Sequence, residues 1–245
     1  MAGHSKWANI QHRKGREDAR RGKIFTKLVR EITVAARMGG PDPDANPRLR
    51  AAITAARKVS MPNDNIKRAI DKAIGSGDGN QLDEIMYEGY GPGGVAFLVE
   101  TVTDNRNRTT PEIRHIFSKH GGNMGEAGSV AWQFDKTGYI QIVKDSKTED
   151  ELTEIVLEVG AEDYEDSGEF WGVLTAPEEL HAVRDALEEQ GLGVESAKWE
   201  MFPQTPIKVE GDTLAQIIKL MEVFEDHDDV QNVWNNADFD EADLE

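Results

Sequence analysis

The spacing of apolar residues changes near residue 80, and this change divides the chain into two parts that fold in different ways. Between residues 23 and 75, apolar side chains recur three and four positions apart, which places them on one face of an α-helix. After residue 80, short β-rich runs such as AFLVETV alternate with helical stretches. The sequence therefore predicts an α+β protein whose helical segment precedes several strand–helix–strand units.

Three short amphipathic helices are predicted in the N-terminal part. The first begins near Lys23 and ends at residues 39–41, Gly-Gly-Pro. The second begins after an Asn46-Pro47 cap, and the third follows Pro62 and ends before Gly75. The residues expected to face the core are Ile24, Phe25, Leu28, Val29, Ile32, Ala35, Ala36, Leu49, Ala52, Ile53, Ala56, Ile66, Ile70, Ala73 and Ile74. We expect a three-helix bundle, followed by a glycine-rich linker at residues 75–79.

The second part contains several strand–helix–strand units. Strands at 95–102 and 129–134 are predicted to flank a helix that begins at Thr110-Pro111. The span from about 135 to 205 has the β-α-β-β-α-β pattern of a ferredoxin-like fold. Its two helices are expected to begin with capping boxes, Thr148 with Glu151 and Thr175 with Glu178. A last unit comprises a strand at 207–209, a helix and a strand at 229–234.

The units at 95–134 and 206–234 each lack a partner, so we expect them to pair with each other around the complete unit between them. This gives an N-terminal three-helix bundle followed by two ferredoxin-like α/β-sandwich domains, one inserted in the other. The predicted domains are 1–80, then 81–134 together with 206–245, and the inserted 135–205. Residues 235–245, which end in DFDEADLE, are expected to form a solvated acidic tail.

Charge is distributed very unevenly along the chain. Of 28 basic and 46 acidic residues, 17 and 7 lie within residues 1–74, which gives that segment a charge of +10 and leaves −28 for the rest of a chain of net charge −18. A basic head on an acidic body is typical of a polyanion-binding domain joined to a second, solubilising part. A Lys- and Arg-rich solvated helix surface is the alternative.

Several classes of function are disfavoured. The absence of cysteine excludes disulfides, thiolate zinc sites and cysteine nucleophiles. No apolar run reaches the roughly 18 residues of a membrane span, and no secretory signal is present. Residues 89–94 match G-x-G-x-x-G, but a β-rich run follows instead of a helix, so a tight turn is expected there. We predict a cytoplasmic protein that is not an enzyme and has no catalytic residue, metal, cofactor, membrane partner or small-molecule substrate.

The basic arm and first helix are the first candidate binding site. Flexible Lys and Arg side chains bind phosphates without reading sequence. The candidate cations are Lys6, Arg13, Lys14, Arg16, Arg20, Arg21, Lys23, Lys27 and Arg30. Trp7 and His12 are candidates for stacking on unpaired bases, although Trp7 could instead anchor the arm to the bundle.

A second candidate site follows the strand at 95–102. Arg106 and Arg108 stand in the run DNRNRT, with Arg114 and Lys119 on the helix after it. The glycine-rich loop that comes next could bring its backbone close to a ligand. Its candidate residues are Gly121, Gly122, Asn123, Met124 and Gly125. A helix stop and a turn are the alternative interpretation of this loop.

These motifs resemble those of a known family. MAGHSKWANIQHRK, RGKIFTKLVREI, GGPDPDANPRLRAAI, MPNDNIKRAI, YEGYGPGG, DNRNRT and GGNMGEAGSVAWQF occur in this order within the first 134 residues. Together they resemble the YebC/PmpR family, which includes the mitochondrial translational activator of cytochrome c oxidase. The resemblance implies three domains and no enzymatic activity. It also implies nucleic-acid binding, either as a DNA-binding transcriptional regulator or as a translation factor that helps the ribosome through difficult sequences such as proline runs.

Three hypotheses remain at this point. The first is an RNA-binding translation factor whose partner is ribosomal RNA, which the acidic body favours because −28 would be repelled by long duplex DNA. The second is a DNA-binding transcriptional regulator. The third is a protein-interaction scaffold in which the basic arm only increases solubility.

Overall fold

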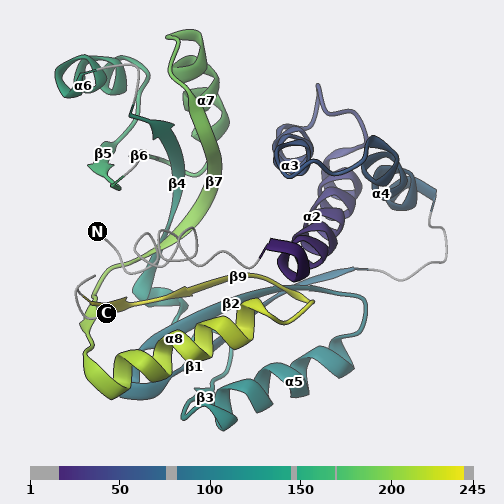
Figure 1. Ribbon diagram of the computed structural model, residues 1–245, viewed down its shortest axis with the longest axis vertical. Helices are drawn as coiled ribbons and strands as arrows, with labels where there is room; N and C mark the ends of the chain where they lie inside the picture. Colours follow the sequence, from purple (N-terminus) through teal and green to yellow (C-terminus); the bar gives the residue numbers. More distant parts are fainter. Residues whose placement is uncertain (1–16, 76–81, 145–147, 169, 240–245) are drawn as a thin grey trace.

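The computed structural model describes residues 17–75, 82–144, 148–168 and 170–239. Figure 1 shows a helical bundle and two α/β layers, one of which lies below the bundle and the other beside it. The chain is thus α+β, with a helical bundle followed by two sandwiches of helices on antiparallel sheets, as predicted. The arm residues 1–16 and the linker residues 76–81 lie outside the described residues.

The bundle consists of α2 (Glu17–Gly39), α3 (Pro47–Lys58) and α4 (Asn63–Gly75). Asn46 caps α3 as predicted, and its side chain ties two helices together. Its Oδ1 accepts from Leu49 N at 3.1 Å, while its Nδ2 donates to the carbonyls of Ala35 and Gly40, each at 2.8 Å. The buried residues of α3 are those predicted. On α2 the predicted residues from Phe25 to Ala36 belong to the core of the bundle.

Two details of the bundle were predicted wrongly. α2 begins at Glu17, six residues before the predicted start at Lys23. Ile24 and Ile74, expected to face inward, are 38% and 60% exposed. The helical period alone does not say how wide the covered stripe is, because the number of neighbours that pack on a helix sets that width.

The lower layer is an antiparallel sheet in the order β3-β1-β2-β9. Its strands are β1 (Asp83–Tyr90), β2 (Ala96–Thr103), β3 (Asn123–Met124) and β9 (Val230–Asn235). The helices α5 (Arg106–Lys119) and α8 (Gly211–Glu225) cover one face of it. β9 pairs with β2 from Phe97↔Asn235 to Thr101↔Val230, so segments from before and after the insertion share one sheet. β1 was not predicted, and because it precedes β2 the connectivity differs from that of a ferredoxin.

The glycine motif at 89–94 forms the turn between β1 and β2, as expected. A short 3-10 helix at Pro92–Gly94 includes Gly93 and Gly94 at positive φ, 68° and 76°. No α-helix follows the turn, because strand β2 begins at Ala96, so the turn lacks the α-helix N-terminus that a dinucleotide phosphate needs.

The predicted strand at 129–134 is wrong. Residues Ala131–Gln133 form a 3-10 helix, η2, and the next strand begins only at Phe134. The cause is Glu88 on β1, whose carboxylate accepts from the backbone N–H groups of Gly128, Val130 and Ala131 at 2.6–2.8 Å. Donors directed at one side chain cannot form a strand ladder.

The upper layer is the sheet β5-β6-β4-β7 with α6 and α7. Its elements are β4 (Phe134–Val143), α6 (Glu149–Glu158), β5 (Asp163–Asp166), β6 (Phe170–Thr175), α7 (Leu180–Glu189) and β7 (Val194–Pro203). This is the predicted β-α-β-β-α-β order, with a sheet order of ferredoxin type. The capping box of Thr148 and Glu151 is confirmed. That of Thr175 is wrong, because its hydroxyl donates to Ala176 O and α7 begins at Leu180.

The end of the described chain is buried, which corrects the prediction of a solvated tail from residue 235. Asn235, Asn236, Ala237 and Phe239 are at most 2% exposed. Ala237–Asp238 forms β10, which pairs in parallel with β8 (Ile207–Lys208). Residues 240–245 lie outside the described residues.

Three of the cores are each built from one predicted domain, and this supports the proposed boundaries. The bundle core uses residues 25–73, the lower core uses residues 85–124 and 207–239, and the upper core uses residues 140–197. A smaller fourth cluster joins the layers, where Trp234 packs against Trp199 with ring centroids 5.0 Å apart.

We predict that excising residues 135–205 and joining the ends by a short turn leaves the bundle and the lower layer folded, because their cores contain no residue of the excised segment. The loss of Trp199 should lower stability without abolishing cooperative unfolding. Circular dichroism during urea titration measures this, with the intact chain as control. A non-cooperative, helix-poor product would contradict the proposed boundaries.

Candidate nucleic-acid interface

Most of the predicted arm residues cannot be placed. Lys6, Trp7, His12, Arg13, Lys14 and Arg16 lie outside the described residues. Arg20 and Arg21 belong to the start of α2, but their side chains also lie outside what is described. The arm therefore stays a prediction.

The remaining cations of the first helix, Lys23, Lys27 and Arg30, face the protein itself. They approach the corner between α8 and β9, residues 225–229, which we call the acidic corner. Lys23 Nζ lies 2.9 Å from Asp226 Oδ1. Arg30 pairs with Asp229 at 2.8 Å and also donates to Asp228 O. These contacts fasten the bundle to the lower layer, so the charges are already partly neutralised.

Lys27 lies in the middle of this contact. Burial lowers the pKa of its ammonium, and the nearby Lys23 adds to the effect, while Glu225, Asp226 and Asp228 act in the opposite direction without restoring the usual value. A half-buried cation held among carboxylates is a poor candidate for a flexible phosphate contact.

Asp229 is the centre of the contact. Its side chain is 2% exposed and accepts from Thr109 Oγ1 at 2.6 Å, Arg108 Nη2 at 2.7 Å and Thr103 Oγ1 at 3.2 Å. Burial by itself would raise the pKa of Asp229, but these hydrogen bonds and the charges of Arg30 and Arg108 outweigh it and hold the pKa below its usual value.

Arg108 therefore has a structural partner in addition to any ligand. Its guanidinium joins α5 to Asp229 and lies 3.3 Å from Asp104. The hydrogen bond to Asp229 and the neighbouring carboxylates raise its pKa. Replacing Arg108 would perturb the acidic corner together with any nucleic-acid contact.

One group of side chains near the acidic corner has the spacing of metal ligands, but its chemistry does not suit a cation. Donor atoms of Glu112, His227 and Asp229 lie within 4.8 Å of one another. Asp229 N donates to His227 Nδ1 at 3.1 Å, so His227 Nε2 carries the hydrogen that faces Glu112 at 3.0 Å. The oxygens of Asp229 already accept from two guanidinium groups, whose charge would repel a metal ion.

The bundle also contacts both layers through ion pairs. Arg48 on α3 lies 2.7 Å from Glu31 and 2.6 Å from Glu84 on β1. Lys58 reaches Glu195 of the upper layer at 3.3 Å.

Beneath the bundle, burial raises the pKa of Glu100 to about 7, and the charges of Glu31 and Glu84 add to this.

Exposed cations gather instead along α5. Asn105 caps this helix through Arg108 N at 3.1 Å, so it begins at Arg106 and not at the predicted Thr110. Arg106, Arg114 and Lys119 are exposed on it. Among the described residues, none forms an ion pair with these three side chains. Helix α5 thus carries three exposed cations, distributed along its length, on a body whose overall charge is acidic.

At the C-terminal end of α5 the structure adds a cation that the sequence did not indicate, Lys219. Burial lowers the pKa of His120, and the positive charges of Lys119 and Lys219 and the nearby His115 lower it further. Lys219 belongs to α8, a hundred residues away along the chain. Two helices therefore place cations around one point beside the glycine-rich loop.

The glycine-rich loop approaches the protein's own β1. A Cβ on Gly122 would lie 2.5 Å from Tyr90 O, and Gly125 N donates to Glu88 O at 2.8 Å. Asn123 and Met124 form β3 and pair with Tyr90 and Gly89. These contacts leave Gly121 and Asn123 as the exposed candidates of the loop.

No helix in the described residues has the length and apolar character required to cross a bilayer.

Comparison with known proteins identifies the family. The model for the "TACO1/YebC protein N-terminal domain" matches residues 5–76, and that for the "TACO1/YebC second and third domain" matches residues 82–237. A probable transcriptional regulatory protein of Koribacter versatilis is 55% identical over 245 residues, covering 100% of this chain and 98% of that protein. One of Carboxydothermus hydrogenoformans is 54% identical, covering 96% and 98%. The crystal structure of a conserved hypothetical protein from Aquifex aeolicus superposes with a TM-score of 0.85 at 48% identity, covering 91% of this chain and 93% of that one. The chain belongs to the TACO1/YebC family.

Proposed function

We propose that this protein is a cytoplasmic, non-enzymatic regulator of gene expression that binds nucleic acid, and that it acts as a translation factor on ribosomal RNA, assisting difficult sequences such as proline runs. The observation that carries the proposal is the row of exposed cations along α5, Arg106, Arg114 and Lys119, none of which forms an ion pair with a described residue. Exposed cations with no internal partner on an acidic body are the footprint of a polyanion.

The distribution of charge favours folded RNA over duplex DNA. The basic arm and the exposed cations of α5 lie in different domains, and the part of the chain after residue 74 carries −28. A uniform duplex would bring phosphates against that acidic surface. A ribosome offers separate phosphate sites, unpaired bases and basic proteins, so two basic points could bind together and raise the effective concentration.

DNA binding is the second candidate function. The relatives from Koribacter versatilis and Carboxydothermus hydrogenoformans bear the name probable transcriptional regulatory protein. That name supports a regulator that binds promoter DNA. The acidic body disfavours this function, because its charge would repel such a duplex everywhere except at the arm.

We predict that ribosomes retain the protein at a salt concentration that releases it from duplex DNA. Changing Arg106 and Arg114 to Ala should weaken the ribosome complex by about tenfold, since two phosphate contacts are lost, and the DNA complex far less. Sedimentation with ribosomes and a gel shift on promoter DNA, in one buffer, measure both. Arg108 is left unchanged because it holds Asp229.

The matched control is Lys208→Ala. Lys208 on β8 is 63% exposed, and its Nζ lies 3.0 Å from Glu210 Oε1, so its replacement removes a surface cation that is not on α5. We expect no change in ribosome retention for this variant. Sequence-selective promoter binding together with absence of ribosome retention would establish the transcriptional function instead.

A further inference from the structure

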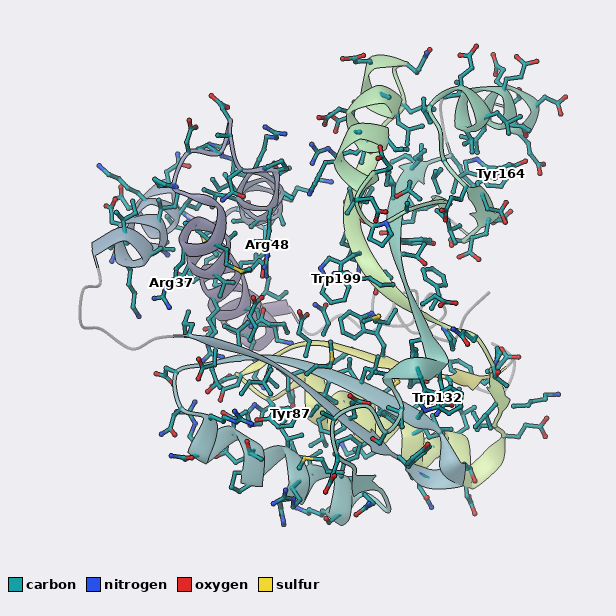
Figure 2. The ribbon with its side chains drawn as sticks, turned by 180° about the vertical axis from the view of Figure 1, so that it is seen from behind. Arg37, Arg48, Tyr87, Trp132, Tyr164 and Trp199 are labelled. Carbon is teal, nitrogen blue, oxygen red and sulfur yellow. The ribbon has the colours of Figure 1, made fainter. Side chains whose placement is uncertain are left out.

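Two exposed aromatic rings lie side by side next to the glycine-rich loop. Trp132 on η2 is 68% exposed and Tyr90 at the end of β1 is 38% exposed. Trp132 Nε1 donates to Ser129 O at 3.2 Å, and Tyr90 Oη donates to the same carbonyl at 3.4 Å. Because both polar groups converge on one oxygen, the two rings are neighbours whose N–H and O–H are satisfied. Figure 2 shows Trp132 where the upper layer joins the lower one.

The rings stand on a fixed support. The carboxylate of Glu88, which is 6% exposed, accepts from the N–H groups of Gly128, Val130 and Ala131. Burial alone would raise the pKa of Glu88, but these backbone hydrogen bonds hold it below its usual value, so the anchor stays charged. Gln133 Nε2 also donates to Tyr90 Oη at 3.3 Å. A ligand that stacks here would lose little entropy in ordering the site.

The same loop follows directly after the C-terminal end of α5, where Lys119 lies. Gly122 packs on Tyr90 O, and a Cβ on Gly121 would lie 3.6 Å from Pro92. The preceding residue, His120, lies in the field of Lys119 and Lys219. Asn123 pairs with Tyr90, so the loop joins the aromatic rings to the cations at the end of α5. Lys219 adds a cation from α8 whose Nζ also lies 3.4 Å from Glu222.

We propose that Trp132 and Tyr90 form a stacking platform for unpaired bases of single-stranded RNA, whose phosphates run toward Lys119 and Lys219. Aromatic faces beside a basic track bind single strands without requiring a particular sequence, because every base has a π face. Bases within a duplex are already stacked and cannot reach the rings. The inference rests on the proposed function and specifies which part of an RNA this surface takes.

The test uses the full chain and fluorescently labelled oligouridylate of about ten nucleotides, with duplex RNA of equal length as the comparison. Anisotropy should show that Trp132→Ala weakens binding of the single strand by about 5- to 150-fold, the range for one lost stacking contact. The salt dependence of binding should stay the same, because no phosphate contact is removed. Duplex binding should be unaffected.

Three further variants test whether the loss of binding is due to the aromatic ring. Trp132→Phe keeps a ring and should retain most of the affinity, and Tyr90→Leu should weaken single-strand binding as Trp132→Ala does. The control is Leu157→Ala, a truncation at an apolar residue that is 73% exposed on α6, which should change nothing. Thermal unfolding confirms that each variant is folded.

Two results would overturn the platform. The first is normal binding of oligouridylate by both Trp132→Ala and Tyr90→Leu, which would exclude the stacking site and leave the proposed function intact. If Trp132→Ala then bound oligouridylate normally but was no longer retained by ribosomes, the rings would belong to a protein-binding surface. Failure of the unmodified chain to bind either RNA at low salt would overturn the platform and the proposed function together.

Discussion

Replacing Asp229 with Ala should lower the free energy of unfolding by about 3–5 kcal/mol, the range expected when one partner of a buried ion pair is removed. The variant leaves two guanidinium groups, from Arg30 and Arg108, and the hydroxyls of Thr103 and Thr109 without their shared acceptor. The bundle should then separate from the lower layer more easily, because Arg30 is one of its fastenings. Urea unfolding measures the free energy.

The control is Asp228→Ala, which removes a neighbouring carboxylate that is exposed. We expect a change of no more than about 0.5 kcal/mol for it, as for most surface substitutions. The pKa of Asp229 is below its usual value in the folded protein, so its contribution is present above about pH 4 and is lost as the pH falls through the folded pKa. A similar, small cost for both variants would show that Asp229 does not hold the domains together.

Replacing Arg13, Lys14, Arg20 and Arg21 with Ala should remove most of the arm's contribution to the salt dependence of nucleic-acid binding. Lys23, Lys27 and Arg30 face the acidic corner, so six cations of the arm remain for phosphates: Lys6, Arg13, Lys14, Arg16, Arg20 and Arg21. Six contacts give a log–log salt slope of roughly −4 to −5, and affinity then falls by a few hundred- to a thousandfold between about 50 and 200 mM salt. The variant should show a slope flatter by about three units.

Fluorescence anisotropy with one RNA over a series of salt concentrations measures this slope. The matched control is Lys23→Ala, which removes a cation of the same helix whose partner is Asp226. We expect its slope to equal that of the unmodified chain. An unchanged slope in the fourfold variant would show that the arm makes no phosphate contact, and the exposed cations of α5 would then be the main binding site.

Local features of the fold could be read from the sequence because the residues that decide them are close together along the chain. The apolar period predicted the three helices of the bundle, and Asn46 with Pro47 predicted the start of the second one. The β-α-β-β-α-β pattern and the box of Thr148 and Glu151 predicted the upper layer. Even the pairing of the two distant segments followed from counting units that lacked a partner.

The candidate site could be read from the sequence only in part. The basic residues of α5 were found because they stand out from an acidic surrounding. Lys219 was missed because it enters from α8, and Trp132 was missed because its segment had the composition of a strand. Only the fold shows that Glu88 takes up the backbone donors of that segment and leaves the ring of Trp132 at the surface.

By itself, the sequence determined the helices, most strands and the uneven distribution of charge, because each depends on the spacing of neighbours. The tertiary structure decided which charges are free. Arg30 and Asp229 are 199 positions apart, and no local sequence pattern predicts that they form an ion pair. A run of lysines and arginines looks the same whether it faces solvent or a carboxylate of the same chain, and only the approach of distant segments distinguishes a binding surface from a domain contact.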